Sequence, residues 1–459
     1  MTMAASAQAY LNFAQTLQKQ GYLPATHHAY EQAYQRAPND VAVIVQFAYF
    51  LEQIGQLTAA TTLLHTGLQQ FPTDPDLLWL AARLDYRQNN HVRALQQLEQ
   101  LLQQPLPAGL QRRSLLQLGL LHDRLGEFPQ AFQKFAQANQ VADQLAQAQG
   151  IRPEFLWDGL GLTDERILCP QWVDQWLGRW DKTFLESDKK QAPIFVVGFH
   201  RSGTTLVGEI LNSHPALQTL VERPVLSTLL EELKTDALKT DVTESYLDRL
   251  RDTESYLDRL RDMDEAALHQ LRSLYYQKVT RLLKLAASQR LVDKFIFNIM
   301  YIPLIKRLFP NAQFILVLRH PYAACLSCFM QNFTLNPLTV HFTILETTAQ
   351  LYTQIMGFWQ QAAVVYKLDV HIVRYEQVVT NFTHEIGRLF DFLALPWHPA
   401  LHTFYLQAQQ NWQIHPPSHA QVSQPLYEDS IERWQRYRAN LQPLHEPLQP
   451  FVAQFGYTT

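Results

Sequence analysis

Hydrophobic and polar positions follow two different patterns along the chain. Up to about residue 145, apolar residues recur at helical spacing in short segments separated by polar turns, which predicts pairs of amphipathic helices. Farther on, the apolar runs Ile194–Phe199 and Phe314–Leu318 are typical of buried parallel strands. The run that starts at Thr204 predicts a helix that ends near Asn212. We therefore expect an all-α region followed by an α/β domain with a central parallel sheet.

Turn-forming residues in the first region recur at a fixed interval. Gly21, Gly55 and Asn89 are 34 positions apart, and Gly126 follows after 37. Each is followed four or five positions later by a small residue, and these residues are Ala25, Ala59, Ala94 and Ala131. A 34-residue period of two helices is the tetratricopeptide signature. The region resembles about four such repeats over roughly residues 5–145, which implies a solenoid that binds peptides or partner proteins. An unrelated helical bundle is the alternative.

The change of pattern divides the chain into three parts. We expect a repeat solenoid over 1–145, a helical connector over 146–191 and an α/β domain over 192–459. The sequence TESYLDRLRD occurs twice in tandem, at 243–252 and 253–262. This duplication predicts a lengthened surface helix or hairpin, and an altered lid over the acceptor site is the alternative.

Composition limits the function classes. With 459 residues and 47% hydrophobic residues, the chain can bury a sizeable core in two or three domains. The formal net charge of -4 gives no general argument for nucleic-acid or anionic-membrane binding. Three cysteines do not form a disulfide framework, and no signal peptide or membrane-spanning run is recognised. A soluble cytoplasmic protein is expected.

The loop between Gly198 and Thr205 has the form of a phosphate cradle. A buried strand, a glycine-containing loop and a helix follow one another, so that backbone N–H groups at the helix start can bind an anion. Nucleotide-triphosphate loops carry a lysine after the second glycine. Here Thr204 follows Gly203, and the loop carries Arg201 instead. This loop suits a diphosphate-like group and argues against a phosphate-loop kinase.

The sequence GFHRSGTTLVGEILNSHP resembles the 5′-phosphosulfate loop of sulfotransferases, which use 3′-phosphoadenylyl sulfate (PAPS) as donor. It is most similar to the protein-tyrosine sulfotransferase pattern, with His200 in place of the usual proline. A second motif agrees, because Arg319 follows a strand and Ser327 lies eight positions later. In the family such a pair binds the donor's 3′-phosphate, and Ser327 about two turns into the next helix could converge with Arg319 on one phosphate.

Three further segments resemble the family in order. Asp293–Asn298 resembles the K-x-P-x-N segment, with Phe or Ile in place of the proline, and Ile372–Val379 resembles a strand that ends in Y-E-x-L-V. Residues 418–437 resemble a late loop that closes over the donor, S-x-x-Q-V-x-x-P followed by S-x-x-[KR]-W. An arginine that the family shows twelve positions after Arg319 is Gln331 here. The resemblance spans about 192–440.

The resemblance implies a role for each matching residue. The 5′-phosphosulfate would be held by Arg201, Ser202, Gly203, Thr204 and Thr205. The rest of the donor would be bound by Arg319, Ser327, Tyr375, near the adenine, and Arg433. The expected catalytic residues are Arg201, Lys294 at the leaving oxygen, Ser418 in transition-state stabilisation and Glu222 as the general base. The family has E-E-x-R where this chain has V-E-R-P, so no role is assigned to Arg223.

Rival chemistries have weaker support. His200, His214 and His320 are alternative bases, since other sulfotransferase branches use a histidine, but each is more readily explained structurally. Cys325 and Cys328 have no second cysteine pair, so metal or redox chemistry is not expected, and neither is a metal cofactor.

The sequence therefore predicts a PAPS-dependent sulfotransferase that forms adenosine 3′,5′-bisphosphate. The acceptor is an open choice between a protein tyrosine, favoured by Glu222, and a carbohydrate or small-molecule hydroxyl. The repeats would bind the acceptor or another protein, with no nucleic acid and no membrane span. A repeat scaffold with a degenerate enzyme domain is the rival, against which the intact motif residues argue.

Overall fold

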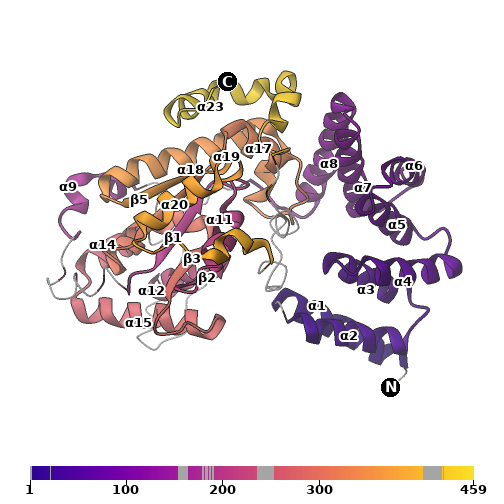
Figure 1. Ribbon diagram of the computed structural model, residues 1–459, viewed down its shortest axis with the longest axis horizontal. Coiled ribbons are helices and arrows are strands. Elements are labelled where there is room, and N and C mark those ends of the chain that lie inside the picture. Colours follow the sequence, from indigo (N-terminus) through magenta and orange to yellow (C-terminus); the bar gives the residue numbers. More distant parts are fainter. Residues whose placement is uncertain are drawn as a thin grey trace.

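A computed structural model describes residues 3–20, 22–153, 164–177, 180, 185, 188, 191–234, 253–406, 426 and 428–458. The first part is an array of antiparallel helix pairs (Figure 1). Its helices are α1 (Met3–Gln20), α2 (Leu23–Arg36), α3 (Val41–Gln53), α4 (Leu57–Gln70), α5 (Pro75–Arg87), α6 (His91–Leu101), α7 (Ala108–Arg124) and α8 (Phe128–Ala148). The predicted repeat solenoid is confirmed.

The recurring turn residues adopt the backbone conformation that ends a helix. Gly55, Asn89 and Gly126 have φ of 75°, 64° and 82° and lie between the two helices of successive pairs. This left-handed region is open to glycine and tolerated by asparagine, which explains why these residue types recur.

The small residues expected between paired helices are buried at only one of the two offsets. Ala60, Ala94 and Ala131, each five positions after the turn residue, are fully buried. Ala25 and Ala59, four positions after it, are exposed, so their assignment to the helix contact is wrong. One residue of shift turns a side chain by ~100° around the helix axis, which moves it off the contact face.

The second part is built on a parallel sheet. Its strands are β1 (Ile194–Gly198), β2 (Leu217–Val221), β3 (Arg290–Lys294), β4 (Gln313–Leu318) and β5 (Asp369–Arg374). Their order is β2-β3-β1-β4-β5, and every pairing in this five-stranded sheet is parallel. The predicted strands at 194–199 and 314–318 and the helix that ends at Asn212 are confirmed, apart from one residue at strand ends.

Alternate residues of β1 enter two separate apolar layers. Phe195 and Val197 face one layer, whereas Ile194 and Val196 face the other. Helices cover both faces (Figure 1). They are α11 (Thr204–Asn212), α12 (Val225–Lys234), α14 (Thr253–Asp262), α15 (Glu265–Leu282), α16 (Ile302–Leu308), α17 (Pro321–Phe329), α18 (Leu345–Val365), α19 (Tyr375–Thr380), α20 (Phe382–Phe392) and α23 (Gln442–Gln454). Burial on both sides explains the continuous apolar runs of the strands.

Short 3₁₀ helices complete this part, namely η2 (Glu165–Leu168), η3 (Ile296–Tyr301), η4 (Thr339–Thr343), η5 (Pro399–Thr403) and η6 (Arg433–Leu441). The segment Ile372–Val379 differs from its predicted form, because the strand ends at Arg374 and helix α19 starts at Tyr375. Arg374 pairs with Leu318, the last residue of β4. Beyond that point β5 has no neighbouring strand with which to continue the ladder.

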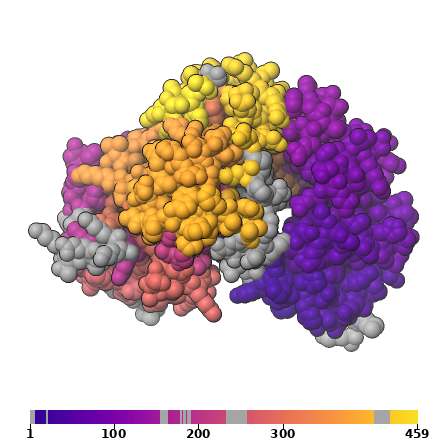
Figure 2. All heavy atoms as spheres, viewed as in Figure 1, coloured from indigo at the N-terminus to yellow at the C-terminus, as the bar shows by residue number. Residues whose placement is uncertain are grey.

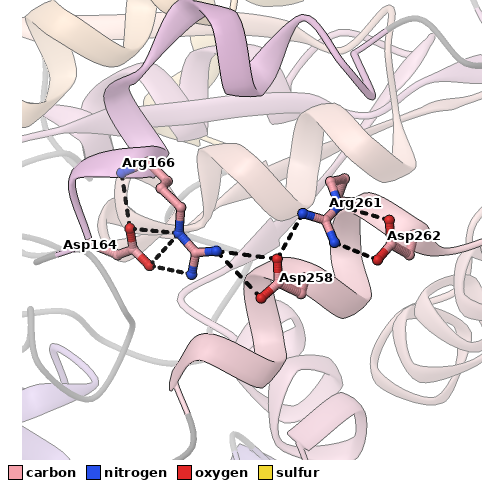
Figure 3. Close-up of polar contacts among 5 residues, drawn as sticks. All are labelled: Asp164, Arg166, Asp258, Arg261 and Asp262. Atoms are coloured by element: carbon pink, nitrogen blue, oxygen red, sulfur yellow. Dashed lines mark hydrogen bonds and ion pairs between the residues drawn. The ribbon is translucent and has the colours of Figure 1, made fainter.

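The second copy of TESYLDRLRD forms α14, whereas the first copy lies outside the described residues. One face of α14 packs against the core, because Leu257 and Leu260 are fully buried. On its other side Asp258 forms ion pairs with Arg166 and Arg261, at 3.2 Å and 3.0 Å (Figure 3). The described copy is thus an amphipathic helix tied to the segment that precedes the sheet.

The last helix pair of the solenoid shares a core with the sheet. Ala131 and Phe135 of α8 belong to the same buried apolar cluster as Phe195 of β1. Asn139 Nδ2 donates to the carbonyl of Phe329 at 2.8 Å, and the ring of Phe132 stacks on that of Phe329 at 5.5 Å. Figures 1 and 2 accordingly show α8 directly beside the C-terminal helices, whereas α1 and α2 lie at the far end of the solenoid.

Candidate functional site

The five strands deliver most of the predicted site residues to one edge of the sheet. The carboxyl ends of parallel strands meet at the same edge, and ligands bind there where the chain direction of the connections reverses. β1 is followed by the loop 199–203, β3 ends with Lys294, and β4 is followed by Arg319. Glu222 comes directly after β2 and Tyr375 directly after β5. The topology therefore concentrates these groups at one edge.

The glycine that ends β1 and the glycine that ends the following loop have no room for side chains. A Cβ on Gly198 would lie 2.6 Å from the carbonyl oxygen of Val317, and one on Gly203 would lie 2.7 Å from the Tyr375 ring. Gly203 also has a φ of 102°, which side-chain-bearing residues rarely adopt. Both glycines are therefore required by the backbone path of the loop.

The start of α11 has the features of an anion site. Gly203 occupies the N-cap position and contributes no capping side chain. Ser202, Thr204 and Thr205 are buried around it, and the Ser202 hydroxyl donates to the carbonyl of Phe199 at 2.7 Å. The first backbone N–H groups of a helix have no intrahelical acceptor, so an anion at this position would satisfy them.

Arg201 joins the loop to α17. Its Nε donates to the Ser327 hydroxyl at 3.0 Å, and its backbone is in the left-handed region with a φ of 63°. Non-glycine residues in this region are uncommon and concentrate at functional sites. Ser327 lies near the end of α17, as its spacing from Arg319 predicts.

Arg319 directly follows β4 at this edge and is 9% exposed. Its guanidinium donates to the carbonyls of Arg201 at 3.2 Å and Ser430 at 2.6 Å, and it lies 4.8 Å from the centre of the Tyr375 ring. Its Nε is buried and has no hydrogen-bond partner among the described residues. A buried N–H donor without an acceptor is costly, so this atom fits a phosphate oxygen.

Tyr375 links the same groups from the other side. Its hydroxyl and that of Ser430 are 2.6 Å apart, while its ring contacts both Arg319 and the Gly203 position. An aromatic face next to a guanidinium can also stack on a planar base. The place of Tyr375 is thus compatible with its predicted position near the adenine.

Lys294 and Glu222 form an ion pair beside the loop. Lys294 Nζ lies 2.9 Å from Glu222 Oε1 and 3.4 Å from Thr205 Oγ1. The side chain of Lys294 is 1% exposed, whereas that of Glu222 is 33% exposed. The Glu222 backbone N–H donates to the Lys294 carbonyl at 2.8 Å, and Glu222 has a φ of 50°. The two predicted catalytic groups are therefore adjacent, and the carboxylate of the pair reaches solvent.

Two carboxyl groups near this pair were not singled out from the sequence. Burial raises the pKa of Glu209 from 4.5 to about 6, with the charge of Lys294 opposing the shift. Burial likewise raises the pKa of Asp293 to about 6, although Tyr275 and Asn298 donate hydrogen bonds to it at 2.7 Å and 2.9 Å. The sequence could have pointed to Asp293, because it is a charged residue in an apolar strand and directly precedes Lys294. Its bond to Asn298 holds the turn that follows Lys294.

The three rival histidines have structural surroundings. His200 lies between the rings of Phe199, Phe297, Phe333 and Phe342. Burial, assisted by the charge of Arg201, lowers its pKa to about 3, so it is a weak base. His214 Nδ1 accepts from the Ala216 N–H, and His320 Nδ1 accepts from the Tyr322 N–H at the start of α17.

For two predicted site residues, the structure describes no contact with the other groups at the sheet edge. Arg433 forms an ion pair with Asp123 of α7, where its NH2 group lies 3.0 Å from Asp123 Oδ2. Ser418 lies outside the described residues. Their roles in donor binding and catalysis stay predictions.

The two cysteines of α17 are buried, and burial raises the pKa of both thiols. Within the described ranges, no group of three or more His, Cys, Asp or Glu side chains is placed to hold a metal ion. Among the helices that the structure describes, none is long and apolar enough to cross a membrane.

Comparison with protein-family models gives two matches. A sulfotransferase family model matches residues 193–399, and a tetratricopeptide repeat model matches residues 55–106. The family expected from the motifs is thereby confirmed for these parts of the chain.

Individual relatives are more distant. An uncharacterized protein of Aquifex aeolicus is 25% identical over 91% of this chain and 51% of its own length. Protein-tyrosine sulfotransferase A of Caenorhabditis elegans is 24% identical over 52% of this chain and 60% of its own length. The chain thus spans about half to three fifths of the curated relatives it matches. Among solved structures, the sulfotransferase domain from the curacin biosynthetic pathway aligns with a TM-score of 0.41 and 21% identity, over 58% of this chain and 98% of that domain.

Proposed function

Since the chain carries a sulfotransferase-family domain behind tetratricopeptide repeats, we propose that it transfers a sulfuryl group from PAPS to an acceptor hydroxyl. The observation that carries the proposal is the cluster at the carboxyl edge of the sheet. It combines the Arg201–Ser327 contact, the Lys294–Glu222 ion pair and the buried Nε of Arg319, which has no hydrogen-bond partner within the described part of the chain. One anion site, one further phosphate contact and one acid–base pair are what this transfer requires.

The residues divide into donor-binding groups and reacting groups. The start of α11 with Arg201, Ser202, Thr204 and Thr205 would hold the 5′-phosphosulfate, and Arg319 with Ser327 would hold the 3′-phosphate. PAPS supplies the activated sulfuryl group when it is bound. Backbone and side-chain donors fixed before the reaction stabilise developing negative charge without reorganisation.

The ion pair beside the loop would perform the proton and charge transfers. Lys294 Nζ, within reach of Thr205 in the first turn of α11, would neutralise charge on the leaving oxygen. Glu222, whose carboxylate reaches solvent at 33% exposure, would accept the proton of the acceptor hydroxyl. Because Lys294 contacts both Thr205 and Glu222, the two roles lie within one hydrogen-bonded chain.

For the acceptor, we propose a tyrosine of a protein recruited by the repeats, because Glu222 occupies the base position of the protein-tyrosine pattern. Carbohydrate and small-molecule hydroxyls are the alternatives. We further propose a solenoid over 1–145, a connector over 146–191 and a catalytic domain over 192–459. A cytoplasmic location fits the three cysteines, each of which is free.

Labelled PAPS incubated with a lysate, a tyrosine-peptide panel and a glycan panel tests both levels of the proposal. Label on tyrosine supports the acceptor proposal, whereas label on glycans or metabolites supports sulfuryl transfer and contradicts the tyrosine acceptor. Failure to bind adenosine 3′,5′-bisphosphate and to transfer label to any class would contradict the proposed activity.

A further inference from the structure

A residue of the repeat domain binds the segment next to the proposed donor site through an ion pair and a hydrogen bond. Asp123 lies at the C-terminal end of α7 and is 11% exposed. Its carboxylate accepts from Arg433 at 3.0 Å and forms a short hydrogen bond with the Tyr437 hydroxyl. Burial raises the pKa of Tyr437, and the adjacent carboxylate adds to the shift, so this hydroxyl stays a donor. In Figure 2 the C-terminal segment lies directly against the last repeats.

The same segment contacts the donor side of the sheet edge. Ser430 lies three residues before Arg433, and its carbonyl accepts from the Arg319 guanidinium at 2.6 Å. Its hydroxyl is 2.6 Å from the Tyr375 hydroxyl. A second, exposed ion pair joins Arg124 of α7 to Asp429 at 3.7 Å. Residues 429–437 therefore connect α7 directly to Arg319 and Tyr375.

We propose that Asp123 is a positioning residue for the nucleotide end of the donor site, so that the last repeat contributes to the affinity for the donor. The inference rests on the proposed function. Asp123 fixes Arg433 at the start of η6 and Tyr437 in its middle. Through η6 it holds Ser430, and Ser430 in turn fixes Arg319 and Tyr375. Arg433, for which the family resemblance implies a role in donor binding, is also the residue that Asp123 orients.

The contacts of Asp123 are of the kind that fix geometry. Two donors converge on one carboxylate that is nearly excluded from solvent, and one of them is charged. Removing the carboxylate would leave the fully buried Tyr437 hydroxyl and a guanidinium without their acceptor. The start of η6 would then move to find other acceptors, and the Ser430 carbonyl would move with it.

The test compares Asp123→Ala with Asp76→Ala. The control breaks a 2.8 Å ion pair with Arg113, which joins α5 to α7 within the solenoid. Calorimetric titration gives the Kd for adenosine 3′,5′-bisphosphate, and steady-state kinetics separates the KM for PAPS from kcat. For Asp123→Ala we expect Kd and KM to rise about tenfold, the size of one charge-assisted hydrogen bond, with kcat within about twofold of the unchanged chain. The control should change neither.

Tyr437→Phe removes a single hydroxyl and keeps the test open if Asp123→Ala does not fold. We expect about a threefold rise in Kd for this variant, since the Arg433 pair remains. An unchanged Kd in both variants, an equal rise in Asp76→Ala, or a fall in kcat without a change in KM would overturn the inference. If the unsubstituted chain does not bind adenosine 3′,5′-bisphosphate, the proposed function fails instead.

Discussion

Replacing Glu222 by Gln tests the assignment of the general base. The change removes the negative charge but keeps an oxygen where Lys294 Nζ now donates at 2.9 Å. The side chain retains its size at a position whose backbone has a φ of 50°. The substitution therefore alters proton acceptance more than it alters shape.

The size of the expected effect follows from the geometry. A positioned general base contributes about 10²- to 10⁴-fold to a reaction rate, so kcat should fall by that factor. Stability should change less. Breaking a fully buried ion pair costs about 3–5 kcal/mol and an exposed one about 0–1 kcal/mol. Here Lys294 is 1% and Glu222 33% exposed and one hydrogen bond survives, so we expect a loss of about 1–2 kcal/mol.

The measurement needs turnover and binding on the same samples. We expect kcat at saturating PAPS to fall in Glu222→Gln, while the Kd for adenosine 3′,5′-bisphosphate stays within about threefold, because the donor contacts lie on the loop, Arg319 and Ser327. Glu209→Gln is the matched control, since it makes the same chemical change at a second carboxyl group under the influence of Lys294. Its turnover should stay within about threefold.

The reasoning is wrong if Glu222→Gln retains turnover while Glu209→Gln loses it, which would transfer the base to α11. It is also wrong if both variants retain full turnover. A parallel loss of turnover and of donor affinity in Glu222→Gln would mean that the ion pair builds the donor site.

The remaining predictions concern recognition, packing and pH. Arg319→Lys should weaken the binding of adenosine 3′,5′-bisphosphate about tenfold or more, because an ammonium lacks the planar fork of a guanidinium. This nucleotide should raise the melting temperature of the unsubstituted chain more than ADP does, and the difference should disappear in Arg319→Lys. Equal shifts with the two nucleotides in the unsubstituted chain would contradict the assignment. Gly119→Ala should lower the free energy of unfolding by about 1–2 kcal/mol in chemical denaturation, because the new Cβ would lie 2.5 Å from the Phe135 ring. Gly109→Ala is the control, and because its Cβ would meet open space, the substitution should be neutral or stabilising. Glu209 has a pKa raised from 4.5 to about 6 in the folded chain, so its stabilising contribution is complete below pH 4.5 and lost as pH rises through 6. Between pH 4.5 and 6, the free energy of unfolding of the unsubstituted chain should therefore fall by up to about 2 kcal/mol relative to that of Glu209→Gln. A difference in unfolding free energy between the two proteins that stays constant with pH would refute the raised pKa.

Much of the site could be predicted because its residues follow strands directly. Lys294, Arg319 and Tyr375 stand at or just after strand ends, so a correct reading of the apolar runs also places them at one edge. The turn residues of the solenoid could also be predicted, because a positive φ favours glycine and asparagine, and Gly55, Asn89 and Gly126 adopt it.

Other features depend on contacts that no local pattern encodes. The pairing of Asp123 with Arg433 joins positions 310 residues apart, and no single motif contains both residues. The helical start at Tyr375 depends on the end of the neighbouring strand β4, which a single-sequence pattern does not specify. Ala60 is buried and Ala59 is not, although the two are adjacent on the same helix. A pattern that allows a small residue either four or five positions after the turn does not decide between them.

The core shared by α8 and the sheet changes what counts as one folding unit. In an ordinary solenoid each repeat needs only its neighbours, so stability is a sum of local terms and unfolding can begin at either end. Here Phe135 packs into the cluster that contains Phe195, so α7 and α8 should exchange their amide hydrogens as slowly as the sheet does. The buried side chains of α1 to α6 form a separate cluster, to which α7 contributes Leu110, Leu118 and Leu121, and these six helices can open before α7 does. The cooperative boundary of the molecule would then fall between α6 and α7, inside the repeat array.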